Sequence, residues 1–236
     1  MITGREAILG RIREALKLSA PMPGDHGPST DAVPVHSHGP AGSPAEIRDW
    51  LPSVGKNWEE NAQLFARNSA DLKTTFLRVP TVAAAHQALK ELAASEKWAR
   101  VAFHQTPLIS GAVSSLGLTS FETKADYDVN ELERCDVGIS ACDALIAQTG
   151  TILLTATSGG GRALSVLPPH HVVIATRDQL LPDLSSGYEL LARVYGKAYP
   201  SFITLITGPS RTGDIERILV LGAHGPKKLT VVLIEE

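Results

Sequence analysis

The pattern of hydrophobic and polar positions divides the chain into three parts. Apolar residues first recur at helical spacing over Ile8–Leu16, with charged residues on the opposite side, which predicts a short amphipathic helix. Prolines and glycines then alternate with polar residues over 19–45, a composition typical of a linker. From Glu46 onward the apolar pattern becomes regular again. We therefore expect an N-terminal helix with a flexible linker over 1–45, and one α/β domain over 46–236.

Within the second part, short apolar runs alternate with longer stretches at helical spacing. After one or two helices over 46–76, the pattern predicts strands near 75–79, 99–104, 120–122, 137–139, 151–155, 172–176, 202–206 and 229–234. It predicts intervening helices over 82–94, 108–116 and 185–195, and a short helical piece that ends at Ala147. Such an alternation is typical of β-α-β units. The expected fold is a three-layer α/β/α domain with a mainly parallel sheet and helices on both faces.

The densest set of polar side chains lies between the last two expected strands, over 207–226. In open parallel sheets, loops at the carboxyl ends of strands hold ligands, so we expect this loop to lie there. It offers hydroxyls, carboxylates, a guanidinium and an imidazole, which can bind a polar ligand or move a proton. The candidate catalytic residues are His224, Asp214 and Glu216, and the candidate anion-binding residues are Ser210, Arg211 and Thr212.

Structural roles compete with these assignments. Asp214 also fits the N-cap of a helix that begins at Ile215, and His224 also fits a turn in which the imidazole satisfies backbone carbonyls. Asp143, between an expected strand and the short helical piece, is a minor catalytic candidate, because an aspartate there most often caps a helix. The neighbours His170 and His171 point to opposite faces of an extended chain, so only one of them can face a site.

A second polar loop directly follows the strand expected over 151–155. Gly159, Gly160 and Gly161 allow successive N–H groups to turn toward one point, as in backbone anion sites, and Arg162 adds a planar fork of donors. The glycine spacing fits neither a dinucleotide fingerprint nor a P-loop. We expect this loop to bind an anion, the alternative being a flexible turn with an arginine salt bridge.

Composition argues against several classes of function. A net charge of −3, with 43% hydrophobic and 20% charged residues, gives no electrostatic footprint for nucleic acid. The two cysteines, Cys135 and Cys142, cannot supply the four ligands of an iron–sulfur cluster, so we expect no cluster in this chain. We also expect no metal site, although three histidines lie in the linker. Without an apolar run of membrane-span length or a signal peptide, the expected location is the cytoplasm.

Three motifs together resemble the lactate-utilisation protein C family, whose members carry the LUD domain: Gly208–Glu216 followed by Gly222–Pro226, Ala147–Thr151, and Gly159–Leu164. The resemblance implies a fold like that of the coenzyme A transferase and sugar-phosphate isomerase superfamily. It also implies participation in bacterial oxidation of L-lactate to pyruvate, together with two companion proteins that carry iron–sulfur centres. Two positions depart from the family pattern: Gln148 replaces a usual acid, and Gly213 a usual alanine.

Three functions are therefore open. The first is a subunit of, or accessory to, a lactate-oxidising system, with a small anionic metabolite held by the two polar loops. The second is a stand-alone enzyme on a sugar phosphate, a folate or a coenzyme A thioester. Coenzyme A transfer needs a carboxylate nucleophile, and an amide at position 148 counts against it. The third is a non-catalytic interaction or regulatory protein that docks a partner through the Ile8–Leu16 helix.

Overall fold

The computed structural model describes residues 9, 13, 52–124, 126–196, 198–212 and 220–236. The expected linker lies outside the described residues, as does the expected N-terminal helix apart from Leu9 and Arg13, which are both helical. The expected boundary near residue 45 also lies outside them and stays a prediction. The chain divides into two units, 1–51 and Pro52–Glu236, and the architecture below is that of the second unit.

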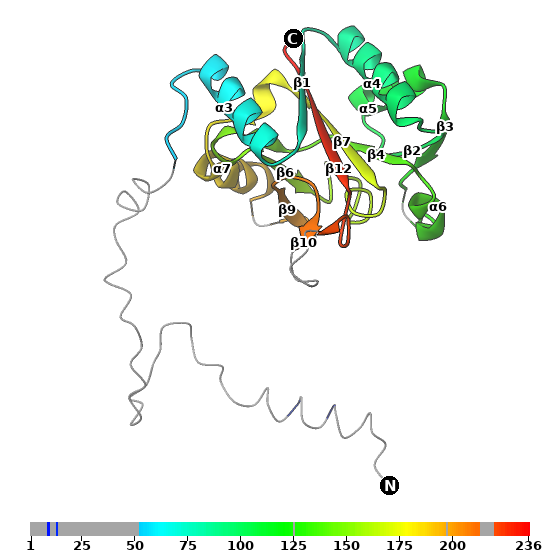
Figure 1. The fold of residues 1–236 in the computed structure, drawn as a ribbon. Helices are drawn as coiled ribbons and strands as arrows, with labels where there is room; N and C mark the ends of the chain where they lie inside the picture. Colours follow the sequence, from blue (N-terminus) through cyan, green and yellow to red (C-terminus); the bar gives the residue numbers. More distant parts are fainter. Residues whose placement is uncertain (1–8, 10–12, 14–51, 125, 197, 213–219) are drawn as a thin grey trace. The chain divides into compact units, whose positions relative to one another are not determined.

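A six-stranded parallel sheet forms the centre of this unit (Figure 1). Its strand order is β1-β12-β7-β4-β2-β3. The strands span Thr75–Val79 (β1), Arg100–Phe103 (β2), Thr119–Glu122 (β3), Val137–Ser140 (β4), His170–Thr176 (β7) and Lys228–Ile234 (β12). The predicted α/β fold with a mainly parallel sheet is confirmed.

Helices α4 (Val82–Glu96) and α5 (Pro107–Leu116) cover one face of this sheet. Each helix begins at a threonine N-cap, because the Thr81 hydroxyl accepts from the Ala84 N–H and the Thr106 hydroxyl from the Ile109 N–H. Their apolar sides pack on the β-branched residues of β4, β7 and β12. The helical spacing of the sequence and its capping residues therefore agree with the structure on this face.

The other face is covered by helix α3 (Trp58–Asp71) and by a second, four-stranded sheet. The order of this small sheet is β8-β5-β6-β9, from Leu180–Leu181 (β8), Ala144–Ile146 (β5), Thr151–Thr155 (β6) and Ile203–Ile206 (β9). Helix α7 (Leu184–Tyr195) packs on its far side. The remaining elements are α6 (Val129–Glu133), the 3-10 turns η1 (Ala147–Thr149) and η2 (Arg177–Gln179), and the hairpin strands β10 (Arg211–Thr212) and β11 (Val220–Leu221).

The small sheet corrects three expectations. Residues 144–146 form a buried strand rather than a helical piece, because they pair with β6 and β8. The second face carries a sheet as well as a helix. The loop over 207–226 leaves β9 of the small sheet and enters β12 at its amino end, so it does not lie at the carboxyl ends of the parallel strands.

The helices within the described ranges are short relative to the thickness of a bilayer. Helix α4 has 15 residues, whereas a membrane span needs about 20 apolar residues. None of the described helices combines the length and the hydropathy needed to cross a membrane.

Candidate functional site

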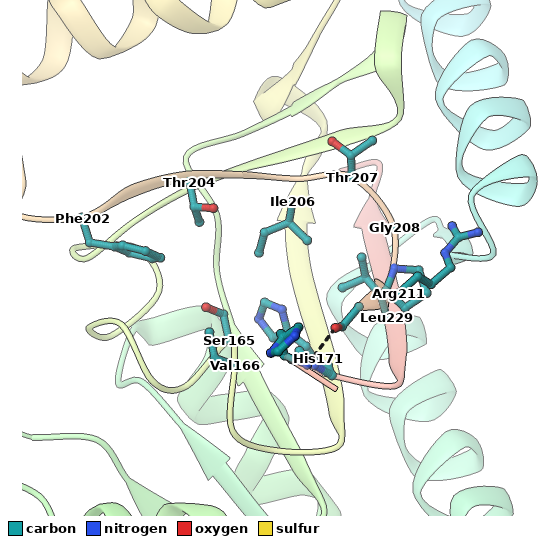
Figure 2. A pocket seen from close by; sticks show the side chains of 15 residues that line it. Ser165, Val166, His171, Phe202, Thr204, Ile206, Thr207, Gly208, Arg211 and Leu229 are labelled. Carbon is teal, nitrogen blue, oxygen red and sulfur yellow. Dashed lines mark hydrogen bonds between the residues drawn. The ribbon is translucent and has the colours of Figure 1, made fainter. Parts of the chain in front are cut away.

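A cavity of about 280 Å³ lies between the two sheets, at the amino ends of β7 and β12. Figure 2 shows side chains from β7, β9 and β12 and from the intervening loops around it. Its described lining combines apolar surface with hydroxyls, two imidazoles and one guanidinium: Ser165, Val166, His171, Phe202, Thr204, Ile206, Thr207, Gly208, Pro209, Ser210, Arg211, His224, Gly225, Pro226 and Leu229. A concave site with a few convergent polar groups is the usual form of a small-molecule site.

His171 is the most deeply placed polar side chain of the lining. It has no exposed surface, and its Nε2 lies 2.9 Å from the Ser140 Oγ. Its Nδ1 has no hydrogen-bond partner among the described residues. Burial, together with the neighbouring His170, lowers the pKa of His171 to about 3, so the imidazole is neutral at pH 7. The neutral ring therefore forms the buried end of the cavity, with Nδ1 itself buried.

The loop over 207–226 is folded back on itself at this cavity. The Ser210 N–H donates to the Pro226 carbonyl at 2.9 Å, and the Gly222 N–H donates to the Ser210 carbonyl at 3.0 Å. Antiparallel pairing of β10 with β11 closes the hairpin. The His224 N–H donates to the Ser210 Oγ at 3.4 Å, and both residues line the cavity. Two predicted site residues are therefore brought together.

The other predicted residues of this loop are placed differently. Arg211 lines the cavity, but its guanidinium donates to the Leu72 carbonyl at the end of α3. Thr212 pairs with Val220 in the hairpin and does not belong to the described lining. Asp214 and Glu216 lie outside the described residues.

The glycine loop contributes no residue to the described lining of this cavity. Gly159 and Gly161 donate their N–H groups to the carbonyls of Thr155 and Ala156, so these two donors are already used within the turn. Gly160 has φ +65°, and a Cβ there would lie 2.3 Å from the His104 Cβ. The three glycines thus permit a tight turn against His104.

Two side chains of the same region have partners of their own. The exposed Arg162 donates to the Ser201 carbonyl at 3.1 Å. The carboxylate of Asp143 accepts from the Thr155 N–H at 2.9 Å and from the Ser158 hydroxyl, and the Tyr195 hydroxyl donates to it at 2.7 Å. Asp143 therefore fixes the turn after β6 and tethers α7, and it caps no helix.

Gln148 is buried in η1, away from the described cavity lining. Its Nε2 donates to the Pro52 carbonyl at 2.7 Å, and its backbone N–H to the Pro182 carbonyl at 2.9 Å. The Gln148 side chain thus acts as a hydrogen-bond donor at this position, and a carboxylate could not donate in this way.

The two cysteines are unpaired and buried in different clusters, Cys142 between the sheets and Cys135 beside α6. Burial raises the pKa of both thiols, and Asp143 raises that of Cys142 further. Both thiols are protonated at pH 7, and metal ligation requires the thiolate.

Sequence reasoning missed His171, Ser140 and Ser165 as candidate site residues. The one available signal was the His170-His171 pair, whose opposite orientations on a strand are confirmed: His171 lines this cavity, and His170 faces α4 on the other side. Nothing near Ser140 or Ser165 in the sequence marks them, because only the folded chain places Ser140 against His171 and Ser165 in the cavity lining.

The fold defines an α/β domain of a kind seen in a solved structure. The crystal structure of a DUF162 family protein from Deinococcus radiodurans matches with a TM-score of 0.60, over 76% of this chain and 99% of that chain, at 21% identity. The family model of the LUD domain matches residues 62–234. The chain therefore belongs to the LUD domain family.

Curated relatives carry the name lactate utilization protein C. The chain is 36% identical to that of Halalkalibacterium halodurans over 132 residues, which are 51% of this chain and 57% of the relative. It is 31% identical to that of Bacillus subtilis over 115 residues, 48% of each chain. The chain spans about half the length of the curated relatives it matches.

Proposed function

We propose that this chain takes part in bacterial lactate utilisation and binds a small carboxylate in the cavity between its two sheets. The names of the curated relatives support the first part. The observation that carries the second part is the buried, neutral His171 together with several hydroxyl groups in the lining of a cavity of about 280 Å³. Ser165 lines the same cavity, and its hydroxyl can donate to a ligand.

L-Lactate fits the chemistry of this lining. The hydroxyls of Ser165 and Ser210 can donate to a carboxylate, and Phe202 and Ile206 offer apolar surface to a methyl group. A neutral imidazole can accept the proton of the substrate hydroxyl. His171 lies at the buried end of the cavity and His224 is exposed.

Oxidation of L-lactate to pyruvate removes two electrons and two protons. In our proposal, companion iron–sulfur proteins accept the two electrons, the two protons pass through a base to solvent, and this chain holds and orients the substrate. His224 is the candidate base, and Asp214 and Glu216 stay candidates outside the described residues. The glycine loop with Arg162 stays a second proposed anion site. The unpaired thiols of Cys135 and Cys142 support a reducing compartment such as the cytoplasm.

Coenzyme A transfer is less well supported. That reaction needs a carboxylate nucleophile, and none of the described residues that line the cavity is an aspartate or a glutamate.

Deletion of the gene in the source bacterium tests the proposed role. We expect the deletion strain to grow on glucose and to lose growth on L-lactate as the sole carbon source. The full chain should restore growth, as should the control Ser120→Ala on exposed β3. Ser165→Ala should restore it only in part. Equal growth of the deletion strain on both carbon sources would overturn the proposal.

A further inference from the structure

A second cavity, of about 400 Å³, lies on the α4 side of β12. It adjoins the first at the amino edge of the sheet, since Pro209, Arg211 and Leu229 line both. Its remaining described lining is rich in cations: Lys73, Thr75, Leu92, Glu96, His170, Leu221, Lys227, Lys228 and Thr230.

The charges of this lining are unbalanced. Four cationic side chains, Lys73, Arg211, Lys227 and Lys228, face a single carboxylate, Glu96. Glu96 forms an ion pair with Lys228, so these two cancel. No carboxylate of the described residues lies within ion-pair distance of the other three cations. Close positive charges without counter-charges repel one another, and an anionic ligand would relieve that repulsion.

Lys227 is held in place by its neighbours. Its aliphatic stem lies across Gly222, where φ is +75° and an added Cβ would lie 2.2 Å from the Lys227 Cγ. Its backbone N–H donates to the Pro169 carbonyl at 2.8 Å. The glycine at 222 therefore permits the lysine stem to take this position beside the cavity.

A buried polar group without a partner belongs to the same lining. His170 is 4% exposed, its Nε2 lies 2.9 Å from the Thr230 Oγ1, and its ring packs edge-on against Trp98 with centroids 5.2 Å apart. Its Nδ1 has no hydrogen-bond partner among the described residues. The Nδ1 atom is itself buried, so the His170 ring forms part of the cavity wall without presenting this nitrogen to the cavity.

We propose that this second cavity binds a phosphate-bearing small molecule, with Lys73, Lys227 and Arg211 around the phosphate and His170 in the cavity wall. Three cations that have no ion-pair partner among the described residues match a phosphate dianion or a diphosphate better than a single carboxylate. The inference stands on this cavity alone and does not depend on the proposed lactate function.

Titration calorimetry with pyrophosphate, at constant ionic strength set with chloride, tests the site. We expect the Lys73→Gln/Lys227→Gln double variant to bind about tenfold or more weakly than the wild type. Lys90→Gln is the matched control, because Lys90 is an exposed lysine of α4 outside both cavities, and it should bind within about twofold of the wild type. No binding to the wild type, or an equal loss in the control, would overturn the proposal.

Chemical protection locates the ligand without relying on the fold of a variant. Lysines of the wild-type chain are acetylated with and without pyrophosphate and quantified by mass spectrometry. We expect Lys73 and Lys227 to be protected and Lys90 not, whereas uniform labelling would contradict the site. A parallel arm with glycerol 3-phosphate distinguishes an organic phosphate monoester from an inorganic diphosphate as the preferred form.

Discussion

The Oγ of Ser140 lies 2.9 Å from the Nε2 of His171, in a contact that is fully buried between β4 and β7. The contact fixes the imidazole at the inner end of the cavity between the sheets. A nitrogen left there without Ser140 would be buried and unpaired.

Removing the Ser140 hydroxyl should therefore lower the stability of the fold. We expect Ser140→Ala to lower the free energy of unfolding by about 1–3 kcal/mol, the usual penalty for an unsatisfied buried group. Urea denaturation measures it. The control Ser120→Ala, at an exposed site of β3, should stay within about 0.5 kcal/mol of the wild type. Equal effects of both substitutions would show that the contact contributes nothing.

The two buried histidines predict how stability depends on pH. Burial lowers the pKa of His170 to about 4, against a partial rise from Glu96, and that of His171 to about 3. Because the unfolded chain titrates near pH 6.5, it binds more protons than the folded chain as pH falls below that value. The contribution of the two neutral imidazoles to the free energy of unfolding is therefore complete above about pH 6.5. It is lost progressively as the pH falls toward 4 for His170 and toward 3 for His171.

Each histidine should contribute about 1–1.4 kcal/mol per pH unit to the slope of unfolding free energy between pH 6 and pH 4.5. Urea denaturation across this range measures the slope. His171→Gln should remove one such contribution, whatever its effect on stability at pH 7. An unchanged slope in the variant would mean that His171 titrates normally in the folded chain.

Gly208 lies in the lining of the cavity between the sheets, and a substitution there tests how closely this part of the lining is packed. Its φ is +83°, and an added Cβ would lie 3.0 Å from both the Leu72 carbonyl oxygen and the Arg211 guanidinium. Gly117, with φ +65° and open space around it, is a matched control for backbone strain alone. We expect Gly117→Ala to cost about 1 kcal/mol and Gly208→Ala about 2 kcal/mol or more in thermal unfolding. A smaller cost at Gly208 would contradict the close packing of this part of the lining.

An acid at position 148 should destabilise this chain. Gln148→Glu replaces the donor to the Pro52 carbonyl with a buried carboxylate, at an expected cost of about 1–3 kcal/mol at pH 7. The cost should shrink at acidic pH, where the protonated glutamate can donate again. The control Gln105→Glu, at an exposed position, should be nearly neutral. Wild-type stability of Gln148→Glu at pH 7 would show that the Pro52 contact is dispensable.

Much of the fold is predictable from local pattern. The alternation from β1 to β3 is correct because each helix carries its apolar face and its threonine cap within its own sequence. The small sheet was not predictable in this way. Residues 144–146 are three apolar positions, too few to show a period, and they become a strand only by pairing with distant β6 and β8.

The candidate site was predictable only in part. Ser210 and His224 stand out because polar residues are dense there, and both line the cavity. The glycine loop shows a limit of such reasoning, since the need for Gly160 arises from its close approach to His104, which is distant in sequence. The role of His171 likewise depends on how the two sheets pack.

The most direct test of the account is calorimetric titration of the purified chain with L-lactate. We predict that the wild type binds, that Ser165→Ala binds about fivefold to tenfold more weakly with an unchanged melting temperature, and that Arg162→Ala stays within about twofold. Such a result would assign the ligand to the cavity between the sheets. Absence of binding to the wild type, or loss of binding in Arg162→Ala with full binding in Ser165→Ala, would contradict it.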